Sequence, residues 1–284
     1  MNNFKKFITR VISGIFLGGI FLLSVFYNKF IFYFLVVIFQ ILSIMELKRM
    51  FPNNIDMVYW ITICLWLDLM ILINLYNYPF ISNLSNFNLS VFANFFLSFI
   101  LIMLAFIIKA LANVKNDNKQ VFENIVTNFF LFIYFIGALA LSFLLFEIKK
   151  GLLFLMIVVT NYSHDIFAYF VGKTLGKNPF FRNISPSKTI EGYIGGVIFS
   201  VIIGLLIALY TGIFELGKIK IILIILSIAT LSAFGDIFES LIKRISNVKE
   251  SGNIIPGHGG VLDRIDSLVF SIYLSSIIYF IIPS

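Results

Sequence analysis

The sequence predicts an all-α, polytopic integral membrane protein with about nine transmembrane helices. Of its 284 residues, 60% are hydrophobic and only 12% are charged, whereas an ordinary soluble domain has about 25% charged residues. The mean hydropathy is +1.01, which excludes a soluble globule and a disordered chain alike. Nine stretches approach the roughly 20 apolar residues that cross a bilayer, at 11–27, 30–47, 57–76, 89–112, 125–146, 152–171, 191–214, 219–240 and 265–282.

The distribution of positive charge predicts a cytoplasmic N-terminus, because cytoplasmic loops of membrane proteins are enriched in Lys and Arg. With the N-terminus inside, 16 of the 21 Lys and Arg residues fall on the cytoplasmic side and 5 on the other. Basic residues followed by an apolar run without a small-residue cleavage site indicate an uncleaved signal anchor. The first two spans meet at Asn28 and Lys29, so they form either a tight hairpin or a pair that does not fully cross.

Two regions differ in character. Residues 1–150 contain few charges and predict helices that pack and face lipid. Residues 151–284 hold both histidines and two cytoplasmic loops, 172–190 and 241–264, so chemistry is expected there. The net charge of +7 suits lipid headgroups and phosphate-bearing substrates rather than nucleic acid. The single cysteine, Cys64, excludes a disulfide framework within the chain.

Acidic residues close several of the predicted spans. Asp165 lies in the last turns of the sixth span, and Asp236, Glu239 and Lys243 lie on one face at the end of the eighth. A carboxylate at hydrocarbon depth costs roughly 2.5–3.5 kcal/mol, so it normally faces the protein interior and has a partner. Since these spans end on the same side, the sequence predicts one shared cytoplasmic pocket.

The segment that follows the eighth span predicts a metal–nucleotide site. Glycines around Pro256 let successive backbone N–H groups point into one concavity, which suits a phosphate. Carboxylates are the hard ligands that Mg²⁺ prefers, and the predicted metal ligands are Asp236, Asp263 and Asp266. The side chains and turn expected to hold a triphosphate are Lys243, Arg244, Lys249, Arg264, Gly257, His258, Gly259 and Gly260.

A second polar cluster precedes the seventh span. Ser185 is expected to cap the following helix, with Pro186 in its first turn. Helix-start N–H groups and Lys188 would then lie at headgroup depth, where they suit a lipid phosphate. The predicted substrate-binding residues of this cluster are Ser185, Pro186, Lys188, Thr189 and Glu191.

Plainer interpretations exist for several of these residues. Asp68, in the middle of the third span, is at least as well explained by a helix-packing contact and is left out of the site. His164 is better explained as a hydrogen-bonded core histidine than as a ligand. Basic loop residues without the glycine-rich turn would be topology signals only.

The run from Ser240 to Asp266, SLIKRISNVKESGNIIPGHGGVLDRID, resembles the signature of the phosphatidate cytidylyltransferases, also called CDP-diacylglycerol synthases. An upstream stretch is similar to the same family, at Asp165, Ala168, Tyr169, Gly172, Gly176, Ser185, Pro186, Lys188, Thr189, Glu191 and Gly192. Three positions depart from the pattern: Glu250 stands where the family has Asp, and Ser187 and Ile190 replace basic and aromatic residues. Asp236, Asp263 and the Pro-Gly-His-Gly-Gly turn are unaffected.

The resemblance implies that phosphatidate and CTP give CDP-diacylglycerol and pyrophosphate, with Mg²⁺ required and K⁺ as a candidate second cation. It also implies a homodimer in the inner membrane with its active site facing the cytoplasm. The expected catalytic residues are Asp236, Asp263, Lys243, Arg264 and His258. Two other classes stay open: a CTP-dependent lipid kinase of the polyprenol type, which would release CDP, and an ion-coupled transporter using Asp68, Asp165 and Asp236.

Overall fold

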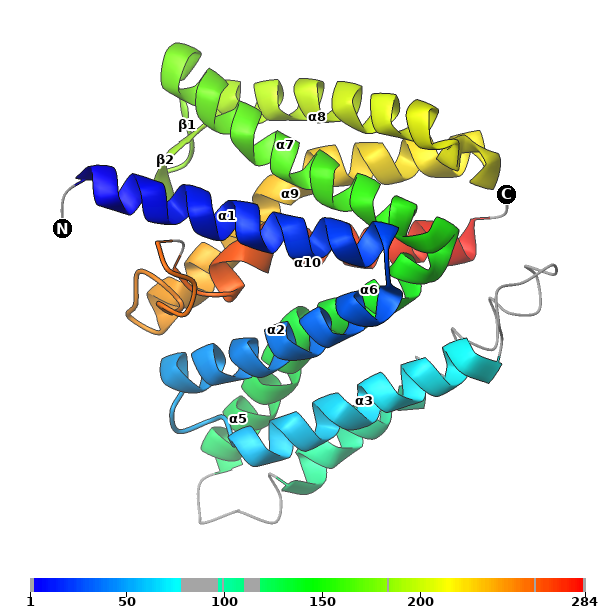
Figure 1. Cartoon of the computed structure of the whole chain (residues 1–284). Helices are drawn as coiled ribbons and strands as arrows, with labels where there is room; N and C mark the ends of the chain where they lie inside the picture. Colours follow the sequence, from blue (N-terminus) through cyan, green and yellow to red (C-terminus); the bar gives the residue numbers. More distant parts are fainter. Residues whose placement is uncertain are drawn as a thin grey trace.

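The computed structural model describes residues 3–77, 97–98, 100–109, 118–182, 184–257 and 259–282. Within these ranges the protein is a bundle of long helices with one short β-hairpin (Figure 1), which agrees with the predicted all-α class. The elements are α1 (Asn3–Phe26), α2 (Lys29–Met50), α3 (Met57–Asn77), α5 (Asn118–Leu131), η1 (Phe132–Gly137), α6 (Ala138–Glu147), η2 (Ile148–Gly151), α7 (Leu152–Leu175), β1 (Pro179–Phe181), β2 (Ser185–Thr189), α8 (Ile190–Thr211), η3 (Ile213–Leu216), α9 (Lys218–Ile245) and α10 (Leu262–Ile281).

Five helical stretches of the described chain are long and apolar enough to cross a membrane: Lys29–Met50, Lys119–Leu175, Ile190–Thr211, Lys218–Ile245 and Leu262–Ile281. The second of these is interrupted at Lys149 and Lys150, whose φ angles of 49° and 54° are left-handed. Shorter apolar helices cover Val11–Phe26, Met57–Ile73 and Ile100–Lys109. The predicted span 89–112 lies partly outside the described residues, so the count of nine stays a prediction.

Ion pairs join the helix ends that the charge count assigns to the non-cytoplasmic side. Lys29 contacts Glu147 at 2.9 Å, and Lys149 contacts Glu215 at 2.6 Å. The first two spans form a helical hairpin (Figure 1), with only Tyr27 and Asn28 between α1 and α2. Asn28 accepts a hydrogen bond from the Phe30 N–H and caps α2. The opposite end of the bundle holds the N-terminus, the β-hairpin and the loop between α9 and α10 (Figure 1).

Glycines let the helices of the C-terminal half approach closely. A Cβ atom on Gly195 would lie 2.6 Å from the Val171 side chain, and one on Gly196 would lie 2.8 Å from His164, so α8 packs directly on α7. A Cβ atom on Gly235 would lie 2.3 Å from the Asp266 carbonyl oxygen, so the backbones of α9 and α10 touch there. Small residues at such crossings permit close helix packing in membranes. The last contact places the acids of α9 beside those of α10.

Candidate functional site

Lys243 joins the end of α9 to the start of α10. Its ammonium group forms an ion pair with Glu239, one turn earlier on α9, and lies 2.7 Å from Asp263 Oδ1. Glu239 is fully buried, and the Lys243 side chain is only 13% exposed. A buried carboxylate needs a counter-charge. Lys243 supplies that charge to Glu239 and also contacts Asp263, which lies 24 residues further along the sequence. Predicted site residues of α9 and α10 are therefore in contact.

Asp236 is paired from the other side of the site. Its carboxylate forms an ion pair with Lys188 of β2, and the Ser240 hydroxyl lies 3.4 Å from its Oδ1 atom. Lys188 was predicted to bind a lipid phosphate and Asp236 a metal ion. The structure brings these two residues into contact, so the predicted lipid and metal sites are adjacent.

Further negative charge comes from α7 and α10. Asp266 interacts electrostatically with Asp236, Glu239 and Asp165. The Ser267 hydroxyl donates to Asp165 Oδ2 at 3.0 Å and links α10 to α7. Three helices therefore direct carboxylates towards one region, and such a concentration of like charge is stabilised only by cations or protons.

The glycine-rich turn lies directly before α10. Gly257 and Gly259 have φ angles of 77° and 85°, a left-handed conformation that favours glycine. The Ile255 N–H donates to the Gly259 carbonyl at 3.0 Å and closes the turn. Asp263 Oδ2 accepts a hydrogen bond from the Gly260 N–H at 2.9 Å. His258 lies outside the described residues.

The remaining basic residues predicted for the triphosphate are exposed. Arg244 lies in the last turn of α9, Lys249 lies in the loop that follows it, and Arg264 lies in the first turn of α10. The Tyr162 hydroxyl donates to the Arg264 carbonyl at 2.8 Å and ties this turn to α7. Exposed guanidinium and ammonium groups can bind phosphate oxygens.

The prediction that Ser185 caps the next helix is wrong. Ser185 and Pro186 lie in strand β2, which pairs with β1, and α8 begins only at Ile190. Thr189 is the cap instead, because its hydroxyl oxygen accepts from the Gly192 N–H at 3.1 Å. The four residues between Ser185 and α8 are extended, because this part of the chain pairs with β1 instead of forming helical hydrogen bonds.

Glu191 braces the same hairpin. Its carboxylate accepts hydrogen bonds from the Lys177 N–H at 3.0 Å, the Asn178 N–H at 3.2 Å and the Asn178 side-chain amide at 2.7 Å. These contacts hold the connection between α7 and β1 against the start of α8. The predicted role of Glu191 in substrate binding stays a prediction.

Asp68 makes a helix-packing contact and His164 is a buried core histidine, as the plainer interpretations of these two residues expected. Asp68 is buried and its Oδ1 accepts from the Gln40 side-chain amide at 3.0 Å, a contact between α2 and α3. His164 is buried on α7, with Nδ1 3.3 Å from Asp165 Oδ1.

Sequence reasoning missed Glu46 and Ser251. Glu46 Oε2 accepts from the Ser251 hydroxyl at 3.0 Å, and the same hydroxyl lies 3.0 Å from Asp263 Oδ2. A signal for Glu46 was present, because it is the only acid in the predicted span 30–47. The burial argument that identified the other acids applies equally to it.

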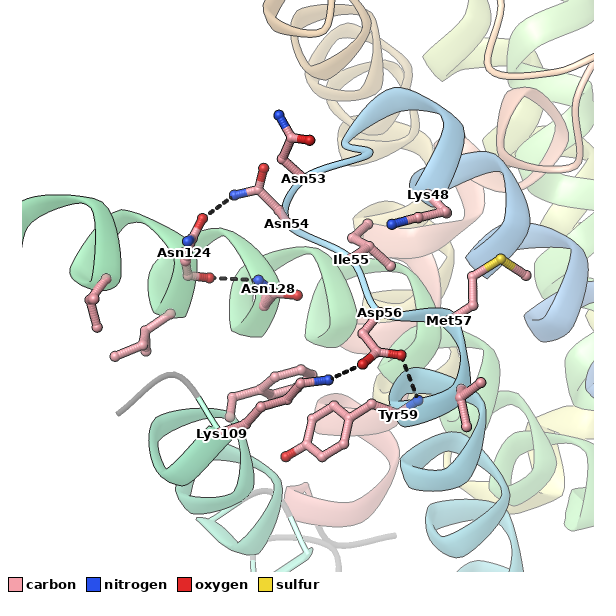
Figure 2. Close-up of a pocket in the computed structure, with 14 residues that line it drawn as sticks. Lys48, Asn53, Asn54, Ile55, Asp56, Met57, Tyr59, Lys109, Asn124 and Asn128 are labelled. Atoms are coloured by element: carbon pink, nitrogen blue, oxygen red, sulfur yellow. Dashed lines mark hydrogen bonds and ion pairs between the residues drawn. The ribbon is translucent and has the colours of Figure 1, made fainter. Parts of the chain in front are cut away.

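A cavity of about 570 Å³ lies elsewhere, between the α2–α3 connection, α5 and the helix that carries Lys109 (Figure 2). Its polar lining includes the Lys109–Asp56 ion pair at 2.6 Å and a hydrogen bond between Asn54 and Asn124 at 2.5 Å. None of the predicted site residues that the structure describes lines it.

Comparison with known proteins identifies the family. The sequence model of the cytidylyltransferase family matches residues 8–282. A phosphatidate cytidylyltransferase of Bacillus subtilis (strain 168) is 44% identical over 112 residues, which cover 39% of this chain and 41% of the relative. One of Helicobacter pylori (strain J99) is 40% identical over 145 residues, covering 49% and 53%. One of Haemophilus influenzae (strain Rd) is 41% identical over 133 residues, covering 46% of each.

The chain spans about half the length of these relatives in the matched segments. The family model, in contrast, covers nearly the whole chain. This chain of apolar helices, with its acids and glycine turn at one end of the bundle, therefore belongs to the cytidylyltransferase family.

Proposed function

We propose that the protein transfers the cytidylyl group of CTP to phosphatidate and releases pyrophosphate and CDP-diacylglycerol. The observation that carries this proposal is the contact between Lys188 and Asp236, which puts the residue suited to a lipid phosphate beside the acids and glycine turn suited to a nucleotide. The relatives named as phosphatidate cytidylyltransferases favour this reaction over the kinase and the transporter.

In the proposed reaction, a phosphate oxygen of phosphatidate attacks the α-phosphorus of CTP. The new P–O bond forms as the bond between the α-phosphorus and the bridging oxygen breaks, so pyrophosphate leaves. Such transfers depend mainly on positioning and on neutralising charge. Phosphatidate is already ionised near neutral pH, so no general base is required of the protein.

The side chains divide this work by position. Lys188 would orient the phosphatidate headgroup from strand β2, which pairs with β1 and ends at Thr189, the cap of α8. Glu191 would hold the connection before β1. The turn at 256–260, together with Arg244, Lys249 and Arg264, would bind the triphosphate. Lys243 would hold the Asp263 carboxylate in position, and its ammonium group would also bind the phosphates of CTP.

Mg²⁺ dependence forms part of the proposal. The donor set fits the ion, because the carboxylates of Asp236, Asp263 and Asp266 are hard oxygen ligands. Among the described residues, no three His, Cys, Asp or Glu side chains already form a coordination shell, and Lys188 and Lys243 pair with two of the acids. A bound Mg²⁺ would neutralise phosphate charge at this position. K⁺ is proposed as a second cation.

The membrane arrangement is proposed in the same way. The excess of Lys and Arg on one side supports nine spans, a cytoplasmic N-terminus and an active site at the cytoplasmic face of the inner membrane. A homodimer is proposed from the family resemblance, with helices of residues 1–150 contributing to it.

Product analysis tests the function. Purified protein in detergent is given phosphatidate and CTP labelled at the α-phosphate, with and without Mg²⁺. We expect the label in the lipid product and one pyrophosphate released for each lipid formed, only when Mg²⁺ is present. Release of CDP with unlabelled lipid would instead establish a CTP-dependent kinase and refute the proposal.

A further inference from the structure

Glu46 connects the N-terminal half of the protein to the proposed active site. It lies near the end of α2 and its side chain is buried. Oε1 accepts a hydrogen bond from the Val261 N–H at 2.8 Å, and Oε2 accepts from the Leu262 N–H at 3.0 Å and the Ser251 hydroxyl at 3.0 Å. All three donors belong to the segment that leads into Asp263.

The two backbone contacts give Glu46 the role of a helix cap. The first N–H groups of a helix have no partner within the helix, and Val261, the residue before α10, makes no side-chain capping bond. A carboxylate at this end also interacts favourably with the helix dipole. Glu46 therefore caps α10 from another helix, 215 residues away in the sequence.

Ser251 connects Glu46 to Asp263. Its hydroxyl lies 3.0 Å from Glu46 Oε2 and 3.0 Å from Asp263 Oδ2, and one hydroxyl proton serves one of these acceptors at a time. The Ser251 N–H donates to Asp263 Oδ2 at 3.2 Å. The two carboxylates thus hold the same end of the loop.

The loop is shaped to admit the Glu46 carboxylate. A Cβ atom on Gly252 would lie 2.5 Å from Glu46 Oε1, and one on Gly260 would lie 2.5 Å from Oε2. Both distances are far below van der Waals contact. Glycine at these positions leaves the space that the carboxylate occupies.

We infer that Glu46 is a positioning residue for cytidylyl transfer: it fixes the 251–262 segment, and with it the Asp263 carboxylate, in the conformation that binds the triphosphate. This inference rests on the proposed function and deepens it. Glu46 contacts the loop rather than the substrates, so its effect reaches CTP through Val261, Leu262 and Ser251.

Glu46→Gln provides the main test, because it keeps the size of the side chain but exchanges one acceptor oxygen for an NH₂ group. At least one of the three donors then loses its acceptor. We expect faster amide hydrogen exchange in residues 251–262 and a KM for CTP raised about tenfold or more, as is typical when a residue supporting a site is changed. The KM for phosphatidate should stay unchanged. Glu123→Gln is the matched control, because Glu123 is 62% exposed on α5.

A second variant keeps the test usable if Glu46→Gln folds poorly. Gly252→Ala leaves the charge in place but pushes the Glu46 carboxylate away, so it should also speed exchange in 251–262 and raise the KM for CTP. In a Glu46→Asp background the shorter side chain leaves room, so the added methyl group should have a smaller effect than in the wild type. Such non-additivity is the signature of two groups in contact.

Unchanged amide exchange in residues 251–262 would overturn the inference, as would an activity loss that lowers kcat alone without altering the KM for CTP. Failure of the proposed function is seen separately, because it would appear as wild-type protein that does not label phosphatidate. The exchange measurement needs no substrate, so it still decides whether Glu46 orders the loop.

Discussion

The Lys243 ammonium group lies 2.7 Å from Asp263 Oδ1 and is also paired with Glu239. One lysine thereby links the last turn of α9 to the first turn of α10, with little exposure to solvent. A lysine held this way has lost the freedom of an exposed side chain. Its position relative to the glycine turn is therefore set before substrate binds.

Lys243→Met should destabilise the protein and abolish cytidylyl transfer. Removing one partner of a buried ion pair costs about 3–5 kcal/mol, because it leaves the other charge uncompensated. Glu239 is that charge here, since its side chain is fully buried. The double variant Glu239→Gln/Lys243→Met should regain much of the lost thermal stability in detergent but no activity. Equal melting temperatures for the single variant and the wild type would contradict the prediction.

Asp236→Asn and Asp263→Asn should each reduce labelling of phosphatidate by at least about 100-fold, the upper range for residues that orient a metal or its ligands. Each change removes a charged oxygen where phosphate and cation are proposed to meet. Glu215→Gln is the control, because Glu215 is 74% exposed in an ion pair at the other end of the bundle. Near-normal activity in folded Asp236→Asn or Asp263→Asn protein would show that the metal assignment is wrong.

Lys188→Ala should raise the apparent KM for phosphatidate more than that for CTP. The residue lies on β2, directly before Thr189, which caps α8, and its partner is Asp236. Steady-state kinetics with each substrate varied in turn would measure the effect. Lys173→Ala, an exposed lysine of α7, serves as the control. The reverse pattern of KM values would exchange the two proposed phosphate sites.

Gly235→Ala should inactivate the enzyme although no charge is removed. The added methyl group would lie 2.3 Å from the Asp266 carbonyl oxygen, so α9 and α10 must separate and Asp236 must move relative to Asp263. Gly19→Ala on α1 is the matched control, since nothing lies within 4 Å of its Cβ position. Full activity in folded Gly235→Ala protein would show that the close approach of the two helices is not needed.

Asp56, which lies outside the membrane spans, forms an ion pair with Lys109 that should make a pH-dependent contribution to the stability of the protein. The hydrogen bond from Lys109 lowers the pKa of Asp56 below its usual 3.8. A lowered pKa means that the stabilisation is complete above the ordinary value and disappears as the pH falls through the folded-state pKa. Asp56 is 53% exposed, so the pair contributes only about 0.2–1 kcal/mol. Asp56→Asn should lower the melting temperature slightly at pH 7 and leave it unchanged at strongly acidic pH; an equal difference at both would contradict this origin.

Much of the fold was predictable because it follows from local composition. Apolar runs identified the helices that the structure describes, and α3, α7 and α8 begin within a residue of the predicted starts. The helix ends were less predictable. α9 continues to Ile245, five residues past the predicted 240. α10 begins at Leu262, three residues before the predicted 265, so Asp263 also lies inside a helix. The helical backbone hydrogen bonds continue through polar residues beyond the apolar run, so hydropathy alone does not show where these helices end.

Candidate site residues were predictable where residue type and local spacing alone indicate a chemistry, as for acids at the ends of apolar spans and a glycine-rich turn. Asp236, Asp263 and the glycine turn were identified from such patterns. The cap at Thr189 was not, because Ser185 and Pro186 suit a helix start equally well and only pairing with β1 decides for a strand. Glu46 was missed because its partners lie more than 200 residues away.

The sequence by itself determined that this chain is a helical membrane protein whose acids and glycines suit a phosphate-bearing substrate, since hydropathy and residue chemistry are local properties. Only the tertiary structure decided which charges meet. Lys188 reaches Asp236, Lys243 reaches Asp263, and Glu46 caps α10 because helices distant in the chain pack at glycines, and no periodicity in the sequence records such crossings.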